Sequence, residues 1–140
     1  MILRTGVDLV EIERLDAVKP SIRERFLKRV FTPAELAESG NQSEYLGGRF
    51  AVKEAVSKAL GTGIGFVRWQ DIECLDGQRG EPVLYLHGNA AKIAKYLGLE
   101  QWSVSISHTR THAVAIAVAL GSSHERPFPE REREADAGLE

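Results

Sequence analysis

Between residues 43 and 60, apolar residues recur at the spacing of an α-helix. This spacing predicts an amphipathic helix with one buried face. The buried face consists of Val52, Ala55, Val56, Ala59 and Leu60. Phe50, Glu54 and Lys58 are four residues apart, so they lie one above another on a single face of this helix. The helix is predicted to end in a glycine-rich loop over residues 61–65.

Shorter patterns on both sides of this helix predict strands and further helices. Alternating or β-branched apolar residues predict strands over 2–10, 71–75, 82–86, 102–107 and 112–120. The second and third of these strands should form a hairpin, because the short segment between them contains two glycines. Helical patterns predict further helices over 11–18, 22–30, 33–39 and 89–97.

Two of these helices carry recognisable start signals. Ser21, followed three residues later by Glu24, predicts a capping box at the start of the helix over 22–30. Thr32 and Glu35 predict a second box, with proline between them at the first helical position. We therefore expect both helices to begin at a side-chain cap.

Two other features predict close packing. Gly47 and Gly48 lie inside the long helix, where each costs about 1 kcal/mol relative to alanine, which indicates close contact with another backbone. The last predicted strand, 112–120, has alanines on one face and Val, Ile or Leu on the other. A strand that is apolar on both faces must be covered on both sides. In so small a chain one cover is expected to be another subunit, and the alanine face would allow close approach.

Composition limits the class of protein. The chain has 140 residues, 43% hydrophobic and 27% charged, with a formal net charge of -2. These values predict one globular domain and argue against a general nucleic-acid binder. No apolar run is long enough to span a membrane, and the N-terminus lacks a signal-peptide pattern. The single cysteine, Cys74, allows no intrachain disulfide, which together with the missing signal predicts a cytoplasmic location.

Charge and polarity divide the chain further. Residues 1–121 are expected to form the domain, and the polar, proline-containing residues 122–140 to form a mobile tail. Five basic residues gather near the N-terminus of this net acidic chain: Arg14, Arg23, Arg25, Lys28 and Arg29. Such a run is either a solvated face or a docking surface for an acidic partner.

A few polar residues stand out as candidates for chemistry. Asp8 lies within an apolar strand, where a carboxylate must be paired, bound to a metal, or placed at an edge. Glu54 and Lys58 either form an exposed salt bridge or take part in a site. Two carboxylates suit Mg²⁺, which takes its other ligands from water and phosphate oxygens. The glycine loop, Lys58 and Arg110 can bind phosphate, so the set indicates phosphoryl-group chemistry.

Other chemistries fit less well. His108 and His112 have neither a thiolate nor a third histidine near them in the sequence, which argues against zinc. The glycine loop follows a helix and lacks the lysine and hydroxyl pattern of a P-loop. Cys74 has no histidine beside it, which argues against a catalytic thiol.

Two long motifs then resemble a known family. Residues 6–12, Gly-Val-Asp-Leu-Val-Glu-Ile, and residues 49–61, Arg-Phe-Ala-Val-Lys-Glu-Ala-Val-Ser-Lys-Ala-Leu-Gly, closely resemble the paired signature of the holo-[acyl-carrier-protein] synthases. These are the short 4'-phosphopantetheinyl transferases. Residues 104–109, Val-Ser-Ile-Ser-His-Thr, resemble the third motif of that family. The resemblance runs from Met1 to about Leu120.

The resemblance implies a fold and an activity. Members of the family are α+β proteins with an antiparallel sheet and packed helices, and they assemble as homotrimers with active sites between subunits. They transfer 4'-phosphopantetheine from coenzyme A to a serine of apo-acyl carrier protein in fatty acid biosynthesis, and release adenosine 3',5'-bisphosphate. The basic residues would then dock the acidic carrier protein, and neither nucleic acid nor membrane is an expected partner.

The resemblance also implies roles for single residues. Asp8 and Glu54 would bind Mg²⁺, and Lys58 would contact the attacked phosphate or assist proton transfer. The nucleotide of coenzyme A would be held by Gly61, Thr62, Gly63, His108 and Thr109. Two groups are candidates to accept the serine proton: Glu54 and a water molecule bound to the metal.

Three other functions compete with this interpretation. One is a transferase for carriers of polyketide or peptide synthases, since the site residues do not set carrier preference. The second is a coenzyme A or nucleotide-binding module without turnover. The third is a scaffold for acidic proteins, which would need the basic residues but not the two carboxylates.

Overall fold

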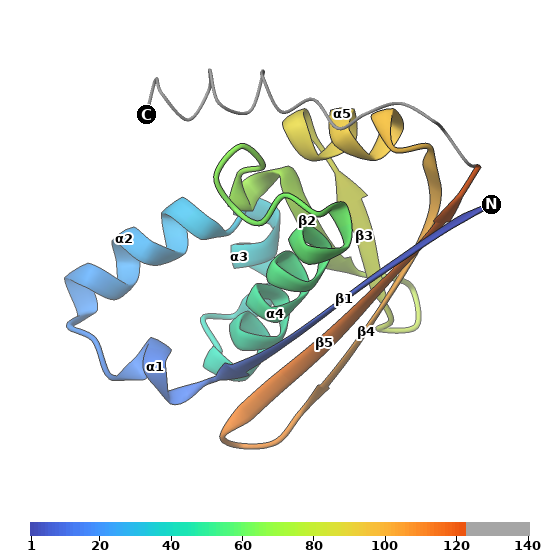
Figure 1. The fold of residues 1–140 in the computed structure, drawn as a ribbon. Helices are drawn as coiled ribbons and strands as arrows, with labels where there is room; N and C mark the ends of the chain where they lie inside the picture. The colour runs from blue at the N-terminus through green and yellow to red at the C-terminus, as the bar shows by residue number, and fades with distance from the viewer. Residues whose placement is uncertain (123–140) are drawn as a thin grey trace.

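The computed structural model describes residues 1–122, which fold around one central helix (Figure 1). The elements in chain order are β1 (Ile2–Glu11), α1 (Glu13–Asp16), α2 (Pro20–Val30), α3 (Pro33–Ser39), α4 (Ser43–Leu60), η1 (Trp69–Asp71), β2 (Ile72–Asp76), β3 (Pro82–Leu86), α5 (Gly88–Tyr96), β4 (Leu99–His108) and β5 (His112–Gly121). All predicted strands and helices are therefore present. The predicted tail lies outside the described residues, apart from Ser122.

Helix α4 packs between two groups of elements. On one side lies a three-stranded antiparallel sheet in the order β1-β5-β4. On the other side lie the β2-β3 hairpin, α3 and α5 (Figure 1). Seven of the helix's apolar residues have no exposed surface, because both sides of the helix are covered. Burial therefore extends beyond the one apolar face predicted for residues 43–60 and includes Lys53 and Ser57.

The inner face of β5, the central strand of the sheet, is made of small residues. Ala113, Ala115, Ala117 and Ala119 of β5 are buried, with at most 1% of their surface exposed. They pack towards α4, whose own core positions belong to the same apolar cluster. The alanine face that we expected to admit a close neighbour is thus covered by a helix of the same chain. The outer face keeps exposed apolar residues, among them Leu3, Val7, Leu9 and Ile116.

Gly6 allows β1 to approach α4 closely. A Cβ atom at this position would lie 1.8 Å from the carbonyl oxygen of Ala55 and 3.0 Å from the nitrogen of Ala59. Only glycine fits this contact. The close backbone packing that we expected at Gly47 and Gly48 is therefore found at Gly6, whereas those two glycines pack against side chains of other elements.

The two expected capping boxes have different outcomes. Thr32 accepts a hydrogen bond from the backbone of Glu35, and the Glu35 side chain accepts one from the backbone of Thr32, which confirms the box. The box at Ser21 is wrong, because α2 begins two residues earlier than predicted, with Pro20 in its first turn and Lys19 as its uncapped N-cap. Proline suits the first helical turn since its missing N–H has no partner there.

No helix among residues 1–122 is long and apolar enough to cross a membrane. The cytoplasmic location stays a prediction.

Candidate active site

Asp8 and Glu54 line one cavity of about 480 Å³. Asp8 comes from β1, where its side chain shares the α4-facing side of the strand with Gly6. Glu54 comes from the middle of α4. The close approach at Gly6 brings these two residues, remote in the sequence, to the same cavity. Both carboxylates thus line this cavity within one chain, and their role as metal ligands stays a prediction.

The cavity has a largely apolar wall beside the carboxylates. Phe50 lies one turn before Glu54 on the same face of α4, as predicted, and lines the cavity together with Phe26 of α2. Their rings are 5.8 Å apart between centroids. Arg14 and Arg23 also line the cavity, so cations border the same space. Neither Phe26 nor Phe50 was singled out as a site residue from the sequence.

Lys58 reaches across to β1. Its Nζ atom donates to the carbonyl oxygen of Val7 at 2.8 Å and to Asp8 Oδ1 at 3.2 Å. About half of the Lys58 side chain is exposed, so a bound anion can still contact it. The exposed salt bridge considered between Lys58 and Glu54 is absent among the described residues, and Lys58 pairs with Asp8 instead.

The charges at this site are unequal. Partial burial raises the pKa of Glu54, and the negative charge of Asp8 raises it further. Lys58 lowers the pKa of Glu54 by a smaller effect. Asp8 thus has a cationic partner in Lys58, whereas no ion pair among the described residues involves Glu54.

The two carboxylates suit a divalent cation. A cation between them would relieve the repulsion that raises the pKa of Glu54. Within residues 1–122, no group of three or more His, Cys, Asp and Glu side chains could hold a metal by itself. A site with two carboxylates is typical of Mg²⁺, which takes further ligands from water and phosphate. The residues present therefore fit this ion.

The predicted nucleotide-binding residues fall into two separate groups. Gly61, Thr62 and Gly63 follow directly after α4, close to Lys58. His108 lies at the end of β4, and its Nδ1 atom is 3.7 Å from Glu44 in the first turn of α4. Because an α-helix rises 1.5 Å per residue, the two ends of α4 are about 25 Å apart. One copy of the chain does not bring these two groups together.

Each of these groups has a defined local structure. Gly61 and Gly63 have positive φ angles of 78° and 64°, which glycine adopts without strain. Thr109 Oγ1 accepts hydrogen bonds from the backbone of Thr111 and His112, which shapes the turn between β4 and β5. The structure also shows a contact that the sequence did not suggest, from Arg4 Nε to the carbonyl oxygen of Ala59 at 2.8 Å. This bond ties β1 to the end of α4.

The five basic residues do not form one uniform surface. Arg14 and Arg23 line the cavity with Asp8 and Glu54, whereas Arg29 lines a second cavity with Arg68. The remaining members are exposed on α2, where Lys28 pairs with Glu24 at 3.1 Å. Arg23 also donates to Asn41 and Ser43. Arg68 was not identified from the sequence, since it is isolated along the chain from the other cations.

Comparisons with known proteins place the chain in a family. Residues 4–118 match the family model of the 4'-phosphopantetheinyl transferase superfamily. A holo-[acyl-carrier-protein] synthase from Natranaerobius thermophilus is 47% identical over 111 residues, which covers 77% of this chain and 89% of that relative. A second, from Solibacter usitatus, is 44% identical over 112 residues, covering 77% and 90%.

Solved structures agree with the sequence relatives. Holo-[acyl-carrier-protein] synthase from Helicobacter pylori, in complex with coenzyme A, has a TM-score of 0.75 at 32% identity, covering 83% of this chain and 99% of that chain. The Plasmodium yoelii acyl carrier protein synthase with ADP bound has a TM-score of 0.78 at 31% identity, covering 88% and 98%.

The chain belongs to the 4'-phosphopantetheinyl transferase superfamily. Within that superfamily it belongs with the holo-[acyl-carrier-protein] synthases, enzymes that transfer phosphopantetheine from coenzyme A to acyl carrier protein in fatty acid biosynthesis. The family, the activity and the α+β fold predicted from the sequence are confirmed.

Proposed function

We propose that the transfer takes place in the cavity between β1 and α4, with Asp8 and Glu54 holding Mg²⁺ and Lys58 binding phosphate. The observation that supports this assignment is the convergence of these three side chains at one place. The H. pylori relative has been solved with coenzyme A. We extend that ligand to this chain, with its pyrophosphate beside Lys58 and its nucleotide on residues 61–63 of one copy.

The chemistry follows from the charges of these residues. When bound, Mg²⁺ would neutralise the pyrophosphate and the leaving group. Lys58 orients the attacked phosphate through its exposed ammonium group. The carrier serine oxygen forms a bond to the β-phosphorus, and the bond from that phosphorus to the bridging oxygen breaks, which releases adenosine 3',5'-bisphosphate. The serine proton passes to Glu54 or to a water molecule at the site.

We further propose that the complete site needs more than one copy of the chain. His108 and Thr109 lie at the far end of α4 from residues 61–63, so a second copy must supply them to the same nucleotide. The exposed apolar residues on the outer face of the sheet provide a surface for assembly, with Val7 of β1 opposite Ile116 of β5. A homotrimer built on this face would meet both requirements.

The acidic carrier protein would approach over Arg14 and Arg23. Both residues line the cavity that holds Glu54, so a carrier bound there presents its serine to the site. Arg25 is exposed on α2 and extends this positive surface. The approach would be steered by charge and would weaken with salt.

Replacing Glu54 by alanine tests the assignment. We expect the rate of transfer to fall at least about a hundredfold, because the metal loses one of two protein ligands. The measurement is the increase in mass of a purified apo-acyl carrier protein incubated with coenzyme A and Mg²⁺. Turnover equal to that of the unchanged protein would remove Glu54 from the site.

The same assay separates the competing functions. A binding module would bind coenzyme A without changing the mass of any carrier, and a scaffold would bind the carrier equally well with a metal chelator. A transferase with another carrier preference would modify carriers of polyketide or peptide synthases faster than the acyl carrier protein. Transfer to the acyl carrier protein that stops with chelator favours the proposal.

A further inference from the structure

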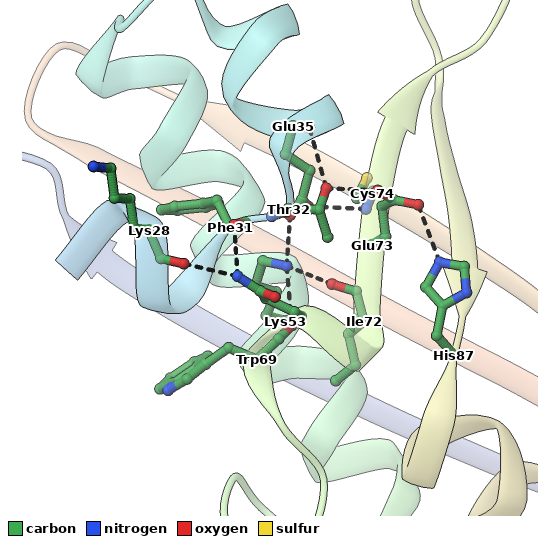
Figure 2. Close-up of polar contacts among 11 residues, drawn as sticks. Lys28, Phe31, Thr32, Glu35, Lys53, Trp69, Ile72, Glu73, Cys74 and His87 are labelled. Carbon is green, nitrogen blue, oxygen red and sulfur yellow. Dashed lines mark hydrogen bonds and ion pairs between the residues drawn. The ribbon is translucent and has the colours of Figure 1, made fainter. Parts of the chain in front are cut away.

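Lys53 precedes Glu54 in the sequence, but it does not line the cavity, and its side chain points into the protein towards Glu35 and Ile72 (Figure 2). Its side chain is fully buried. The ammonium group donates to Glu35 Oε1 at 2.7 Å, to the carbonyl oxygen of Trp69 at 3.0 Å and to the carbonyl oxygen of Ile72. A lysine has three protons to donate, and here each has an acceptor.

Glu35 is held as firmly as its partner. Its side chain is also fully buried. Oε1 accepts from the backbone of Thr32 at 2.9 Å, and Oε2 accepts from the backbone of Cys74 at 3.0 Å, as Figure 2 shows. The ion pair with Lys53 therefore joins three elements, α3, α4 and β2, and its charged groups are satisfied on all sides.

A buried ion pair of this kind is a poor source of stability, because removing two charges from water costs about as much as their attraction returns. It is better suited to specifying one arrangement of the elements that carry it. Lys53 is fixed at three points, so α4 cannot rotate about its axis without breaking these bonds. Because Glu54 is the next residue on the helix and Lys58 lies one turn further, the same bonds set the direction of both side chains.

A second path leads from Lys53 to the wall of the cavity. The ammonium group binds the backbone of Trp69, and the Trp69 ring stacks on Phe50 with 5.0 Å between ring centroids. Phe50 lines the cavity one helical turn before Glu54. Loss of the ion pair would therefore loosen the aromatic wall as well as the helix.

We propose that the Glu35–Lys53 ion pair is a positioning pair, which fixes the rotation of α4 that directs Glu54 and Lys58 towards Asp8. This inference rests on the proposed roles of Glu54 and Lys58, but Glu35 and Lys53 themselves contact neither substrate nor metal.

Helix α3 offers a matched control one turn further on. Glu38 accepts from the hydroxyl group of Tyr45 on α4 at 2.5 Å and from the backbone of Asp76 on β2 at 3.0 Å. Glu38 thus joins the same three elements as Glu35. Tyr45 lies more than two turns before Glu54, however, and its bond is exposed. A change at Glu38 weakens the packing of these elements without releasing the segment that carries Glu54.

The test compares Glu35→Gln with Glu38→Gln. We expect Glu35→Gln to lower kcat about tenfold or more while the KM for coenzyme A changes less than about threefold, because a small displacement of reacting groups costs more rate than binding. Its affinity for Mg²⁺, measured by calorimetry without turnover, should fall as well. Glu38→Gln should leave kcat and the Mg²⁺ affinity unchanged. Melting temperatures establish that both variants are folded at the assay temperature.

Two outcomes would overturn the inference. One is a kcat of Glu35→Gln equal to that of Glu38→Gln or of the unchanged protein, which would make the pair merely structural. The other concerns two variants of Lys53. Lys53→Arg keeps the charge and the hydrogen-bond donors, so it should retain more activity than Lys53→Met. A more active Lys53→Met would contradict a positioning role. If Glu35→Gln does not fold, the comparison of Lys53→Arg with Lys53→Met tests the inference instead. Neither outcome affects the assignment of Glu54, which Glu54→Ala tests separately.

Discussion

At the scale of single residues, the site is defined by which of the two carboxylates, Asp8 or Glu54, forms an ion pair with Lys58. Helical spacing alone suggests that Lys58 pairs with Glu54, but the ammonium group binds Asp8 and the backbone of Val7. Glu54 is left partly buried and close to a like charge, which raises its pKa. Of the two carboxylates, Glu54 is therefore the one that a bound cation would stabilise more.

This charge has a consequence for stability. The pKa of Glu54 is higher in the folded protein than in the unfolded chain. The ionised carboxylate therefore destabilises the fold at a pH above its raised pKa, and this effect disappears at a pH below its ordinary pKa. Without divalent cations at pH 7, Glu54→Gln should raise the melting temperature by roughly 1–3 °C, a small gain since the group is partly exposed. Thermal unfolding at several pH values measures it.

The gain from Glu54→Gln should shrink as the pH falls and should vanish below the ordinary pKa of the group, where the carboxyl group is protonated in both the folded and the unfolded chain. Added Mg²⁺ should stabilise the unchanged protein more than the variant. A variant that is less stable than the unchanged protein at pH 7 would contradict this account of the charges.

At the scale of elements, the site depends on how closely β1 approaches α4. The strand and the helix were both predicted from their patterns, and the confirmed capping box at Thr32 followed from local rules. The start of α2 was misplaced since proline and serine are adjacent start signals, and only the structure shows that proline occupies the first turn. The contact at Gly6 was missed because a glycine inside a strand has several explanations.

Gly6→Ala should therefore disrupt both fold and site. The added Cβ would meet the Ala55 backbone, which cannot move without shifting α4, so we expect a loss of about 3 kcal/mol in the free energy of unfolding. Urea denaturation measures this loss. Thr5→Ala, next to it on the outer face of the same strand, should cost about 0.5 kcal/mol or less. Equal costs at both positions would mean that the approach of β1 to α4 is not tightly constrained.

At the scale of the whole molecule, one chain carries the two halves of the predicted nucleotide site at opposite ends of α4. The family motifs identified the residues of both halves, but sequence alone does not measure the distance between them. The outer face of the sheet, where Ile116 of the central strand is 45% exposed, is the surface through which we propose that copies of the chain associate.

A mixing experiment tests whether sites form between copies. Glu54→Ala and His108→Ala should each be inactive alone, because each damages every site. After the two are unfolded and refolded together in equal amounts, about one quarter of the sites should contain neither change, and activity should return accordingly. The mass-shift assay measures it. Mixed proteins that stay inactive would place both residues in one chain's site.

Assembly itself can be tested at Ile116. A lysine at this exposed position should prevent association while the inner face of β5 remains packed on α4. Light scattering should then report the monomer mass, with the circular dichroism of the folded chain retained. An unchanged oligomer would exclude the outer face of the sheet as the interface.

The proposed docking of the acyl carrier protein also depends on the charge of the molecular surface. Changing Arg14 and Arg25 to glutamate should raise the KM for the carrier protein about tenfold or more, since attraction becomes repulsion, and should leave the affinity for coenzyme A unchanged. The same reversal at Lys92 and Lys95 on α5 is the control, because these residues line a different cavity. A parallel loss of both affinities would show that the arginines do not act through the carrier.

The amino-acid sequence by itself determined the elements and the family, and it predicted the site residues. These follow from local periodicity and from motifs that are contiguous along the chain. Only the tertiary structure decided which side chains meet: Lys58 with Asp8, Glu35 with Lys53, and β1 with α4 at Gly6. Such contacts join residues far apart in the sequence, and they depend on packing distances that no local pattern encodes.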